Sequence, residues 1–383
     1  MRPNYRIHPD MIIAVNAQLL LKDRLEGLGW FTYETLKRIT RQHPEHRFVF
    51  IFDRPWDQEF LFSDNIIPVK TLIPSRHPLL WYWRFEKTIP RLLKNYRADL
   101  FLSTDGWSSL NTDVKSYTVI HDIDFVHHPQ NFPWLKQKYF NYYFPKFARK
   151  ATRLGTVSEF SRNDLVNTWN LPADSIDVIY NGSNELYKPL SSDTAEQTRK
   201  EYTQGKPYFI YVGALNPRKN IEGMLQGFEL FKQQNDLPHQ LVIVGEKMWG
   251  NSGMDKVYES MSHKNEVLFT GRLSNEKLHV LLASAQALVL VSHLEGFGIP
   301  VLEAMYCDIP VLCSNVTALP EVASTAGHLV NPGSIDSIAR GFAKLASDEA
   351  YRNQLIANAR IQRTKFSWDQ SAERLWNGIA KCF

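Results

Sequence analysis

The chain has 383 residues, of which 44% are hydrophobic and 22% are charged, and its formal net charge is +4. This length is too great for one hydrophobic core and suits two domains of ordinary size. A net charge of +4 on so long a chain is far below that of a nucleic-acid-binding domain, so we expect no nucleic-acid partner.

Features of membrane-spanning, secreted and disulfide-stabilised proteins are missing from the sequence. The apolar run "MIIAVNAQLLL" is interrupted by Asn16 and Gln18 and stays short of the roughly 18 to 20 residues that span a bilayer. The start "MRPNYRIHPD" has no apolar signal-peptide core, and three cysteines are too few and too unevenly spaced for a disulfide framework or a zinc site. We therefore expect a cytoplasmic protein.

Short apolar runs alternate with longer amphipathic stretches, which is typical of a parallel sheet covered by helices. In the first half, strands are predicted at residues 11–17, 47–53, 99–104, 116–122, 153–158 and 176–181. In the second half, they are predicted at residues 208–215, 239–245, 266–271, 287–292, 309–314 and 327–332. The fold class is therefore α/β, with two Rossmann-like doubly wound domains whose ligands bind at the carboxyl ends of the strands.

The two series of strands are separated by a polar segment, which indicates a linker. We predict an N-terminal domain at residues 1–187, a linker at 188–206 and a C-terminal domain at 207–383. Apolar residues at helical spacing predict a terminal helix at 368–383, which we assign to the C-terminal domain.

The stretch "HLEGFGIPVLEA" places Glu295 and Glu303 on either side of a Gly-Phe-Gly bend. Gly296 and Gly298 let the main chain turn sharply and approach a ligand, and the start of the following helix offers N–H groups to an anion. A carboxylate that accepts two hydrogen bonds suits the vicinal hydroxyls of a sugar or ribose. For an isolated pair of glutamates, a plain turn followed by a solvent-facing helix residue stays open as the alternative.

Five further segments contribute to a family resemblance together with this stretch: "YVGALNPRKNIEGMLQGF", "VLFTGRLSNEKLHVLLASA", "VIYNGSN", "GLGWFTYETL" and "VIHDIDF". Taken together with the two spaced glutamates, the chain resembles family 4 (group 1) of the retaining, nucleotide-sugar-dependent glycosyltransferases with the GT-B fold. The resemblance implies two Rossmann-like domains that face a central cleft, with the acceptor on the N-terminal domain and the nucleotide sugar on the C-terminal one.

The resemblance assigns the donor-binding residues to the C-terminal domain. Lys219 matches the lysine that binds the donor pyrophosphate, and Arg218 beside it offers a guanidinium fork. Glu295 matches the catalytic glutamate that approaches the transferred sugar, and Glu303 matches the one that holds the ribose. The other substrate-binding positions on this side are Gly271, Arg272, Gly296, Phe297 and Gly298.

Two positions on the donor side depart from the common pattern of the family. Ala214 stands where many relatives have an arginine, and whether Arg218 replaces it stays open. Cys307 and Asp308 stand where many relatives have a small residue and glycine, which we interpret as a change in the connection between helix and strand.

In the first half, His121 ends a predicted strand, where parallel sheets bind their ligands. The resemblance implies that it lies near the transferred sugar, as a second catalytic residue, with Asp122 as a substrate-binding neighbour. Gly27 and Gly29 match the glycines that let the main chain lie against the donor phosphate and the acceptor. A purely structural histidine is the alternative for His121.

The chemistry follows from the donor. A nucleotide-diphosphate sugar reacts through an oxocarbenium-like state, in which a protein can neutralise the departing diphosphate and position the acceptor hydroxyl. Arg218, Lys219 and the helix start near 298–301 would do this without a metal or another cofactor, and no Asp-x-Asp motif lies where a donor would need it.

The resemblance implies transfer of a hexose, of mannose or glucose type, to a polysaccharide or glycolipid acceptor in cell-surface glycan synthesis, with retention of the anomeric configuration. Two alternatives stay open, a GT-B sugar-nucleotide epimerase and a non-catalytic sugar-nucleotide-binding protein.

Two segments of the N-terminal domain suggest where the acceptor arrives. Residues 132–153 carry basic and no acidic residues among many aromatics, and residues 81–97 add five basic residues against one glutamate. Basic and aromatic side chains suit the surface of an anionic bilayer, so we expect a peripheral contact with the inner face of the membrane and a lipid-linked glycan acceptor. Ordinary amphipathic helices with an aromatic core are the alternative.

Overall fold

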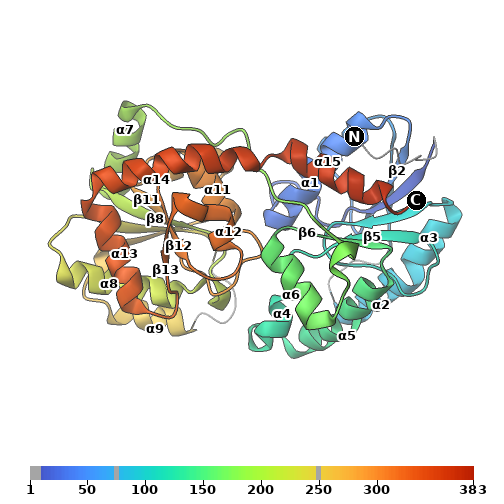
Figure 1. The fold of residues 1–383 in the computed structure, drawn as a ribbon, viewed down its shortest axis with the longest axis horizontal. Helices are drawn as coiled ribbons and strands as arrows, with labels where there is room; N and C mark the ends of the chain where they lie inside the picture. Colours follow the sequence, from blue (N-terminus) through green and yellow to red (C-terminus); the bar gives the residue numbers. More distant parts are fainter. Residues whose placement is uncertain (1–9, 73–76, 247–251) are drawn as a thin grey trace. The chain divides into compact units, whose positions relative to one another are not determined.

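The computed structural model describes residues 10–72, 77–246 and 252–383. The chain divides into a first unit, Met1–Gly182 with Ser367–Phe383, and a second unit, Ser183–Phe366. Each unit is a sheet with helices packed against it (Figure 1). The fold class is therefore α/β with two Rossmann-like units, as the sequence predicts.

The first unit is built on a seven-stranded parallel sheet in the order β3-β2-β1-β4-β5-β6-β7. Its strands are β1 (Ile12–Asn16), β2 (Arg47–Phe52), β3 (Ile66–Lys70), β4 (Leu100–Ser103), β5 (Lys115–Val119), β6 (Arg153–Thr156) and β7 (Ile176–Val178). The central strands are buried along almost their whole length, which explains why they are continuous apolar runs rather than alternating patterns.

The helices of the first unit include one that closes the chain. They are α1 (Gly27–Gln42), α2 (Pro78–Trp83), α3 (Ile89–Asn95), α4 (Asp124–His127), α5 (Trp134–Lys150), α6 (Glu159–Trp169) and α15 (Trp368–Ala380). A π-helical turn, Arg84–Thr88, joins α2 to α3. The start of α6 shows how the sequence sets a boundary, because the hydroxyl of Ser158 accepts a hydrogen bond from the N–H of Ser161 at 3.0 Å.

Strand β3 is the one strand of this sheet that the sequence analysis missed. It contains Pro68, which has no N–H to donate to a neighbouring strand. The sheet order puts β3 at the edge, where a proline is tolerated because only one side of the strand is paired.

The second unit is built on a six-stranded parallel sheet in the order β10-β9-β8-β11-β12-β13. Its strands are β8 (Tyr208–Val212), β9 (Gln240–Val244), β10 (Val267–Gly271), β11 (Ala287–Leu290), β12 (Val311–Ser314) and β13 (Gly327–Val330). Its helices are α7 (Ser192–Thr203), α8 (Ile221–Gln234), α9 (Ser252–Ser260), α10 (Asn275–Ala283), α11 (Ile299–Tyr306), α12 (Leu319–Ala323), α13 (Ile335–Ser347) and α14 (Glu349–Gln362). All six strands coincide with predicted ones.

The terminal helix belongs to the first unit, so its assignment to the C-terminal domain at 207–383 was wrong. Helix α15 packs on α1 through its apolar face. The indole of Trp376 stacks on the imidazole of His43 with ring centroids 3.6 Å apart, and Arg38 Nε donates to Asp369 Oδ1 at 2.5 Å. The sequence showed that this helix has a face to bury but not which domain covers it.

The prediction of a linker at 188–206 was also wrong, because most of this segment is the regular helix α7 inside the second unit. Helix α7 packs against α10, and Arg199 Nη1 donates to the carbonyl of Ser284 at 3.2 Å. Its few buried residues, Thr198 and Thr203, are polar, so the helix lacks the apolar stripe that would have revealed it.

Both sheets reverse their strand order once, at β1/β4 in the first unit and at β8/β11 in the second. In open α/β sheets, ligands bind outside the carboxyl ends of the strands at such a reversal point. The fold therefore marks one ligand-binding edge in each unit. Within the described ranges, no helix is both long and apolar enough to pass through a bilayer.

Candidate functional site

An ion pair bridges the reversal point of the second sheet. Lys219 follows β8 and Glu295 follows β11, and Lys219 Nζ lies 2.5 Å from Glu295 Oε1. Both side chains are largely buried, at 13% and 6% exposure. The structure therefore brings together the residues that the sequence analysis proposed for the diphosphate and for the transferred sugar.

Glu295 is fixed by hydroxyl groups from the segments that follow β11 and β12. Ser292 Oγ donates to its Oε1 at 2.7 Å, and its own N–H donates to Thr317 Oγ1 at 3.2 Å. Ser314 Oγ in turn donates to the carbonyl of Ser292 at 2.6 Å. These supporting hydroxyls were not predicted, because Thr317 and Ser314 act through contacts between segments far apart along the chain and Ser292 belongs to no recognisable motif.

Opposing effects set the charge of Glu295. Burial acts to raise the pKa of its carboxyl, but the charges of Lys219 and Arg218, with hydrogen bonds from Lys219 and Ser292, outweigh burial and hold the pKa below its usual value. Glu295 is therefore ionised at neutral pH and carries a negative charge at the ligand-binding edge.

Arg218 and Lys219 lie in a short 3₁₀ turn, Pro217–Lys219, just before α8. The carbonyl of Arg218 accepts a hydrogen bond from the N–H of His293 at 2.9 Å, which ties this turn to the segment that precedes Glu295. Two basic side chains before a helix start are unfavourable to the helix dipole, so the arrangement favours an anion there. Ala214 leaves that position without a cationic side chain, and Arg218 beside Lys219 is the nearest arginine in this segment.

Asn220 is a residue of this site that the sequence analysis did not single out. It has a left-handed φ of 55° and caps α8 by accepting from the N–H of Gly223. Its Nδ2 donates to the carbonyls of Val291 and Pro332 at 3.0 and 2.8 Å. One buried amide thus joins the lysine turn to the carboxyl ends of β11 and β13.

The Gly-Phe-Gly bend leads directly into α11. Gly298 has a φ of 97°, and a Cβ there would lie 2.6 Å from Leu319 Cδ2, so only glycine fits. Gly296 is buried, and the ring of Phe297 packs edge-to-face on Phe366 with centroids 5.5 Å apart. The side chain of Phe297 is thus part of the core, which leaves only the main chain of this bend for a ligand.

Glu303 lies in α11 and has a partner different from that of Glu295. Its carboxyl forms a hydrogen bond with the hydroxyl of Tyr187, whose ring packs edge-on against His279. Burial raises the pKa of Glu303 to about 7, and the Tyr187 hydrogen bond opposes this effect. Sequence spacing could not have found Tyr187, which comes from the segment before α7.

Gly271 ends β10 with a φ of 69°, and no atom lies within 4 Å of where its Cβ would be. The neighbouring Arg272 is exposed. Closer to the reversal point, a Cβ on Gly245 would meet the carbonyl of Gly213, so the loops after β8 and β9 touch through their backbones. The structure places Gly271 and Arg272 at the carboxyl end of a strand, as the sequence analysis expects.

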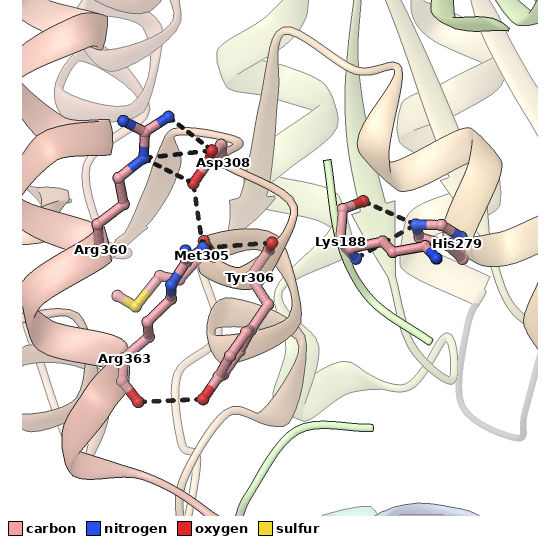
Figure 2. A network of polar contacts seen from close by, with 7 residues as sticks. All are labelled: Lys188, His279, Met305, Tyr306, Asp308, Arg360 and Arg363. Atoms are coloured by element: carbon pink, nitrogen blue, oxygen red, sulfur yellow. Dashed lines mark hydrogen bonds and ion pairs between the residues drawn. The ribbon is translucent and has the colours of Figure 1, made fainter. Parts of the chain in front are cut away.

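The connection after α11 carries the unusual Cys307 and Asp308. Asp308 has a left-handed φ of 57°, and its carboxylate contacts Arg360 at 2.7 Å and Arg363 at 3.0 Å (Figure 2). The side chain of Arg363 also donates to the carbonyl of Met305 at 2.7 Å. The aspartate therefore anchors the end of α14 to the helix-to-strand connection.

In the first unit, His121 follows β5 and is buried. Its Nε2 donates to the carbonyl of Thr104 at 2.9 Å, which leaves Nδ1 as the unprotonated nitrogen of the neutral ring. Burial lowers the pKa of His121, and the ring of Phe31 packs edge-on at 4.9 Å. This histidine is therefore a neutral, fixed group at the ligand-binding edge.

Three other predicted residues of the first unit lie at or next to the start of a helix. Asp122 Oδ1 accepts from the N–H of Asp124 at 3.1 Å, next to the start of α4. Gly27 is the first residue of α1, and Gly29 lies in its first turn, where a Cβ would be 3.2 Å from the carbonyl of Leu19. The two glycines therefore lie in the first turn of a helix rather than in a separate loop.

A group that could be mistaken for a metal site lies elsewhere in the first unit. Among the described residues, His43, Glu45 and His46 bring ligand atoms within 4.8 Å of one another. However, the N–H of Met11 donates to His46 Nδ1 at 3.2 Å, so the proton of the neutral ring is on Nε2, the nitrogen that faces Glu45. This arrangement suits a hydrogen bond rather than a metal.

Comparison with known proteins agrees with this geometry. The model of the glycosyl transferases group 1 matches residues 193–362, and the model of Glycosyltransferase Family 4 matches residues 25–185. The O-antigen chain mannosyltransferase B of Escherichia coli is 31% identical over 264 residues, which cover 69% of each chain. The chain belongs to glycosyltransferase family 4.

A second relative of this family 4 chain is the O-antigen chain mannosyltransferase RfbU of Salmonella typhimurium. It is 27% identical over 270 residues, which cover 70% of this chain and 71% of the relative.

Solved structures establish the GT-B fold of this family 4 protein. The Anabaena protein Alr3699/HepE, crystallised with UDP and glucose, has a TM-score of 0.75 at 18% identity and covers 98% of this chain and 100% of its own. WaaG, a glycosyltransferase involved in lipopolysaccharide biosynthesis, has a TM-score of 0.74 at 15% identity and covers 95% and 98%. As a family 4 member, the chain is a glycosyltransferase.

Proposed function

We propose that this protein transfers a hexose from a nucleotide-diphosphate sugar to a glycan acceptor in the synthesis of cell-surface polysaccharide or glycolipid. The observation that carries the proposal is the Lys219–Glu295 ion pair at the reversal point of the second sheet. It sets a cation for a diphosphate beside a carboxylate for sugar hydroxyls, the two features that distinguish such a donor.

Mannose is the sugar that the relatives favour. The matched proteins of Escherichia coli and Salmonella typhimurium are both named as O-antigen chain mannosyltransferases. The structurally similar Anabaena protein was crystallised with UDP and glucose, which keeps a glucose-type donor as the second candidate.

The described residues supply a route for the departing diphosphate. Arg218, Lys219 and the N–H groups at the start of α11 would neutralise its charge, with no metal or other cofactor required. The bond from the anomeric carbon to the diphosphate breaks as a bond to the acceptor oxygen forms on the same face. The leaving phosphate takes the acceptor proton, so no separate protein base is needed. Because the new bond forms on the same face as the broken one, the configuration is retained without a protein nucleophile.

Each unit offers one proposed catalytic residue, His121 in the first and Glu295 in the second. The neutral imidazole of His121 offers Nδ1 as a hydrogen-bond acceptor, and Glu295 offers its second carboxylate oxygen, Oε2. Glu303 would accept hydrogen bonds from the ribose. The alternatives, an epimerase or a non-catalytic binding protein, lack this support because both matched relatives are named as transferases.

A peripheral contact between the first unit and the cytoplasmic membrane surface is part of the proposal. Trp134 and Tyr142 on α5 are 69% and 57% exposed, and Trp83 on α2 is 54% exposed. Glu86, the acidic residue of 81–97, is buried and accepts hydrogen bonds from the N–H of Leu110. Most other aromatics of α5 are core residues, so the exposed ones and the surrounding cations would form the contact.

A two-stage experiment tests the proposal. A thermal-shift screen against GDP, UDP and ADP identifies the nucleotide, because a ligand at 100 times its dissociation constant adds about 2.7 kcal/mol of stability. The matching mannose and glucose donors are then incubated with methyl α-D-mannopyranoside, and the product is analysed for linkage and anomeric configuration. Nucleotide binding without transfer or hydrolysis of any donor would favour the non-catalytic alternative, and an inverted product would contradict retention.

A further inference from the structure

The reversal point of the first sheet holds a buried polar cluster, which we call the Asp105 cluster: Asn16, Gln18, Ser103 and Asp105. Asn16 Nδ2 donates to both oxygens of Asp105 at 3.0 and 3.1 Å. Gln18 Nε2 donates to Oδ2 at 2.6 Å, and Ser103 Oγ donates to Oδ1 at 2.7 Å. Asn16 ends β1 and Asp105 follows β4, so the cluster spans the point where the strand order reverses.

One atom of the Asp105 cluster is left without a partner. Gln18 Oε1 is buried and accepts no hydrogen bond from any part of the chain that the structure describes. The amide cannot simply flip to change this, because its Nε2 is committed to Asp105. Gln18 is 7% exposed, so a carbonyl oxygen that needs a donor is held in a buried position at the ligand-binding edge.

The local charge favours a neutral donor for this oxygen. Arg84 is fully buried and its Nη2 lies 3.4 Å from Asn16 Oδ1, so the cluster already contains a cation to balance Asp105. Burial lowers the pKa of Arg84 to about 10, which the charges of Asp53 and Asp105 oppose, and the guanidinium stays protonated at neutral pH. A hydroxyl therefore suits Gln18 Oε1 better than an ammonium group does.

The same short segment that holds Gln18 also holds His121. Thr104 lies between Ser103 and Asp105, and its carbonyl accepts the hydrogen bond from His121 Nε2 at 2.9 Å. Its hydroxyl lies 2.7 Å from that of Thr32 on α1. Gln18 and His121 are thus fixed relative to each other by three consecutive residues, within one unit.

We infer that Gln18 is a recognition residue for the acceptor, whose sugar hydroxyl donates a hydrogen bond to Oε1, and that Asp105 is the positioning residue that orients the amide. This inference rests on the proposed function. Because Oε1 is buried, the inferred contact requires the segment that follows Gln18, residues 19–26, to move when the acceptor binds. Acceptor binding then supplies the donor that the buried carbonyl lacks.

The test combines one variant with a set of acceptors. Gln18→Met keeps the volume of the side chain but removes both polar atoms. With the donor found by the nucleotide screen, the KM of methyl α-D-mannopyranoside should rise about tenfold, the effect of a single hydrogen bond. Donor hydrolysis without acceptor and nucleotide affinity should match the parent.

Deoxy acceptors separate recognition from a general structural effect. The 2-, 3-, 4- and 6-deoxy forms of the mannoside are compared in the parent and in Gln18→Met. For the parent, one deoxy form should have a higher KM than the full mannoside, because it lacks the hydroxyl that Gln18 contacts. For Gln18→Met, this deoxy form and the full mannoside should have equal KM values, because the variant no longer contacts that hydroxyl. Asp105→Asn should reduce the same discrimination, since the amide of Gln18 loses its orientation.

Gln362→Met is the matched control. Gln362 is 6% exposed in the second unit and donates to the carbonyls of Glu321 and Val322. The variant therefore loses comparable hydrogen bonds, but its acceptor KM should equal that of the parent. Unchanged acceptor KM and full deoxy discrimination in Gln18→Met would overturn the inference and leave a water as the partner of Oε1. If the parent transfers no sugar, the proposed function fails separately, and saturation-transfer NMR with the mannoside still decides whether Gln18 binds it.

Discussion

Lys219 and Glu295 are hydrogen-bonded to each other, with Nζ and Oε1 2.5 Å apart. The cation proposed for the diphosphate is thus partly neutralised by the carboxylate proposed for the sugar. On the proposed function, a donor diphosphate would compete with Glu295 for Lys219 and would free the carboxylate for the hydroxyls of the donor sugar. The pair would then link recognition of the two ends of one substrate.

Lys219→Ala should weaken binding of the nucleoside diphosphate by roughly 1.5 to 3 kcal/mol, the contribution of a charged hydrogen bond. Isothermal titration calorimetry measures the loss. Lys200→Ala is the control, because Lys200 forms an exposed ion pair with Glu196 on α7 and should bind nucleotide as the parent does. Equal affinities in Lys219→Ala and the parent would remove the phosphate assignment.

Glu295→Gln should lower turnover without weakening the binding of free nucleotide. Turnover should fall at least about tenfold, because the charge beside the transferred sugar is lost. Binding of free nucleoside diphosphate should be equal or tighter, because Lys219 no longer has to leave an anionic partner. Steady-state kinetics and calorimetry measure the two quantities. A collapse of nucleotide binding would identify Glu295 as a structural residue of the turn.

Glu303 should make stability depend on pH. Its pKa is raised from 4.5 to about 7 in the folded chain, so between these values the folded state holds a proton that the unfolded state has released. The free energy of unfolding should therefore fall as pH rises from about 4.5 to about 7 and level off above that. Urea unfolding at pH 5, 6, 7 and 8 measures the difference in the free energy of unfolding between the parent and Glu303→Gln. A difference that stays constant over this range would show that the carboxyl is already ionised at pH 5.

Replacing Asp308 by glycine should destabilise the fold less than replacing it by alanine. Both variants lose the contacts with Arg360 and Arg363, but only alanine has a Cβ at the left-handed φ of 57°. Asp308→Ala should be less stable than Asp308→Gly by about 1 to 2 kcal/mol, the steric cost of that conformation. Chemical denaturation measures the order, and equal stabilities would show that the connection relaxes.

The membrane contact can be tested through exposed apolar residues alone. Trp134→Ser with Tyr142→Ser should reduce co-sedimentation with phosphatidylglycerol vesicles at low salt and leave nucleotide binding unchanged. Ile361→Ser with Leu329→Ser is the control, because these residues of the second unit are also exposed, at 70% and 39%. Parent protein that stays in the supernatant at every ionic strength would favour a soluble acceptor.

Local patterns predicted most of the fold because each buried strand is a short apolar run between polar segments. They missed β3, whose Pro68 weakens the strand pattern, and they misplaced α15, whose buried face says nothing about the partner that covers it. In the site, Lys219 and Glu295 lie in recognisable segments. Asn220 and Tyr187 do not, since their roles depend on partners such as Pro332 and Glu303, far away along the chain.

The return of α15 to the first unit has a consequence for synthesis on the ribosome. The second unit, Ser183–Phe366, is an insertion whose sequence is complete before the last helix of the first unit has been made. The first unit therefore begins before the second unit and is completed after it, and the faces of α1 and β6 that receive α15 stay uncovered until Ser367–Phe383 has been made. A stop codon after Phe366 should consequently leave the second unit intact and expose the N-terminal half of the enzyme to proteolysis.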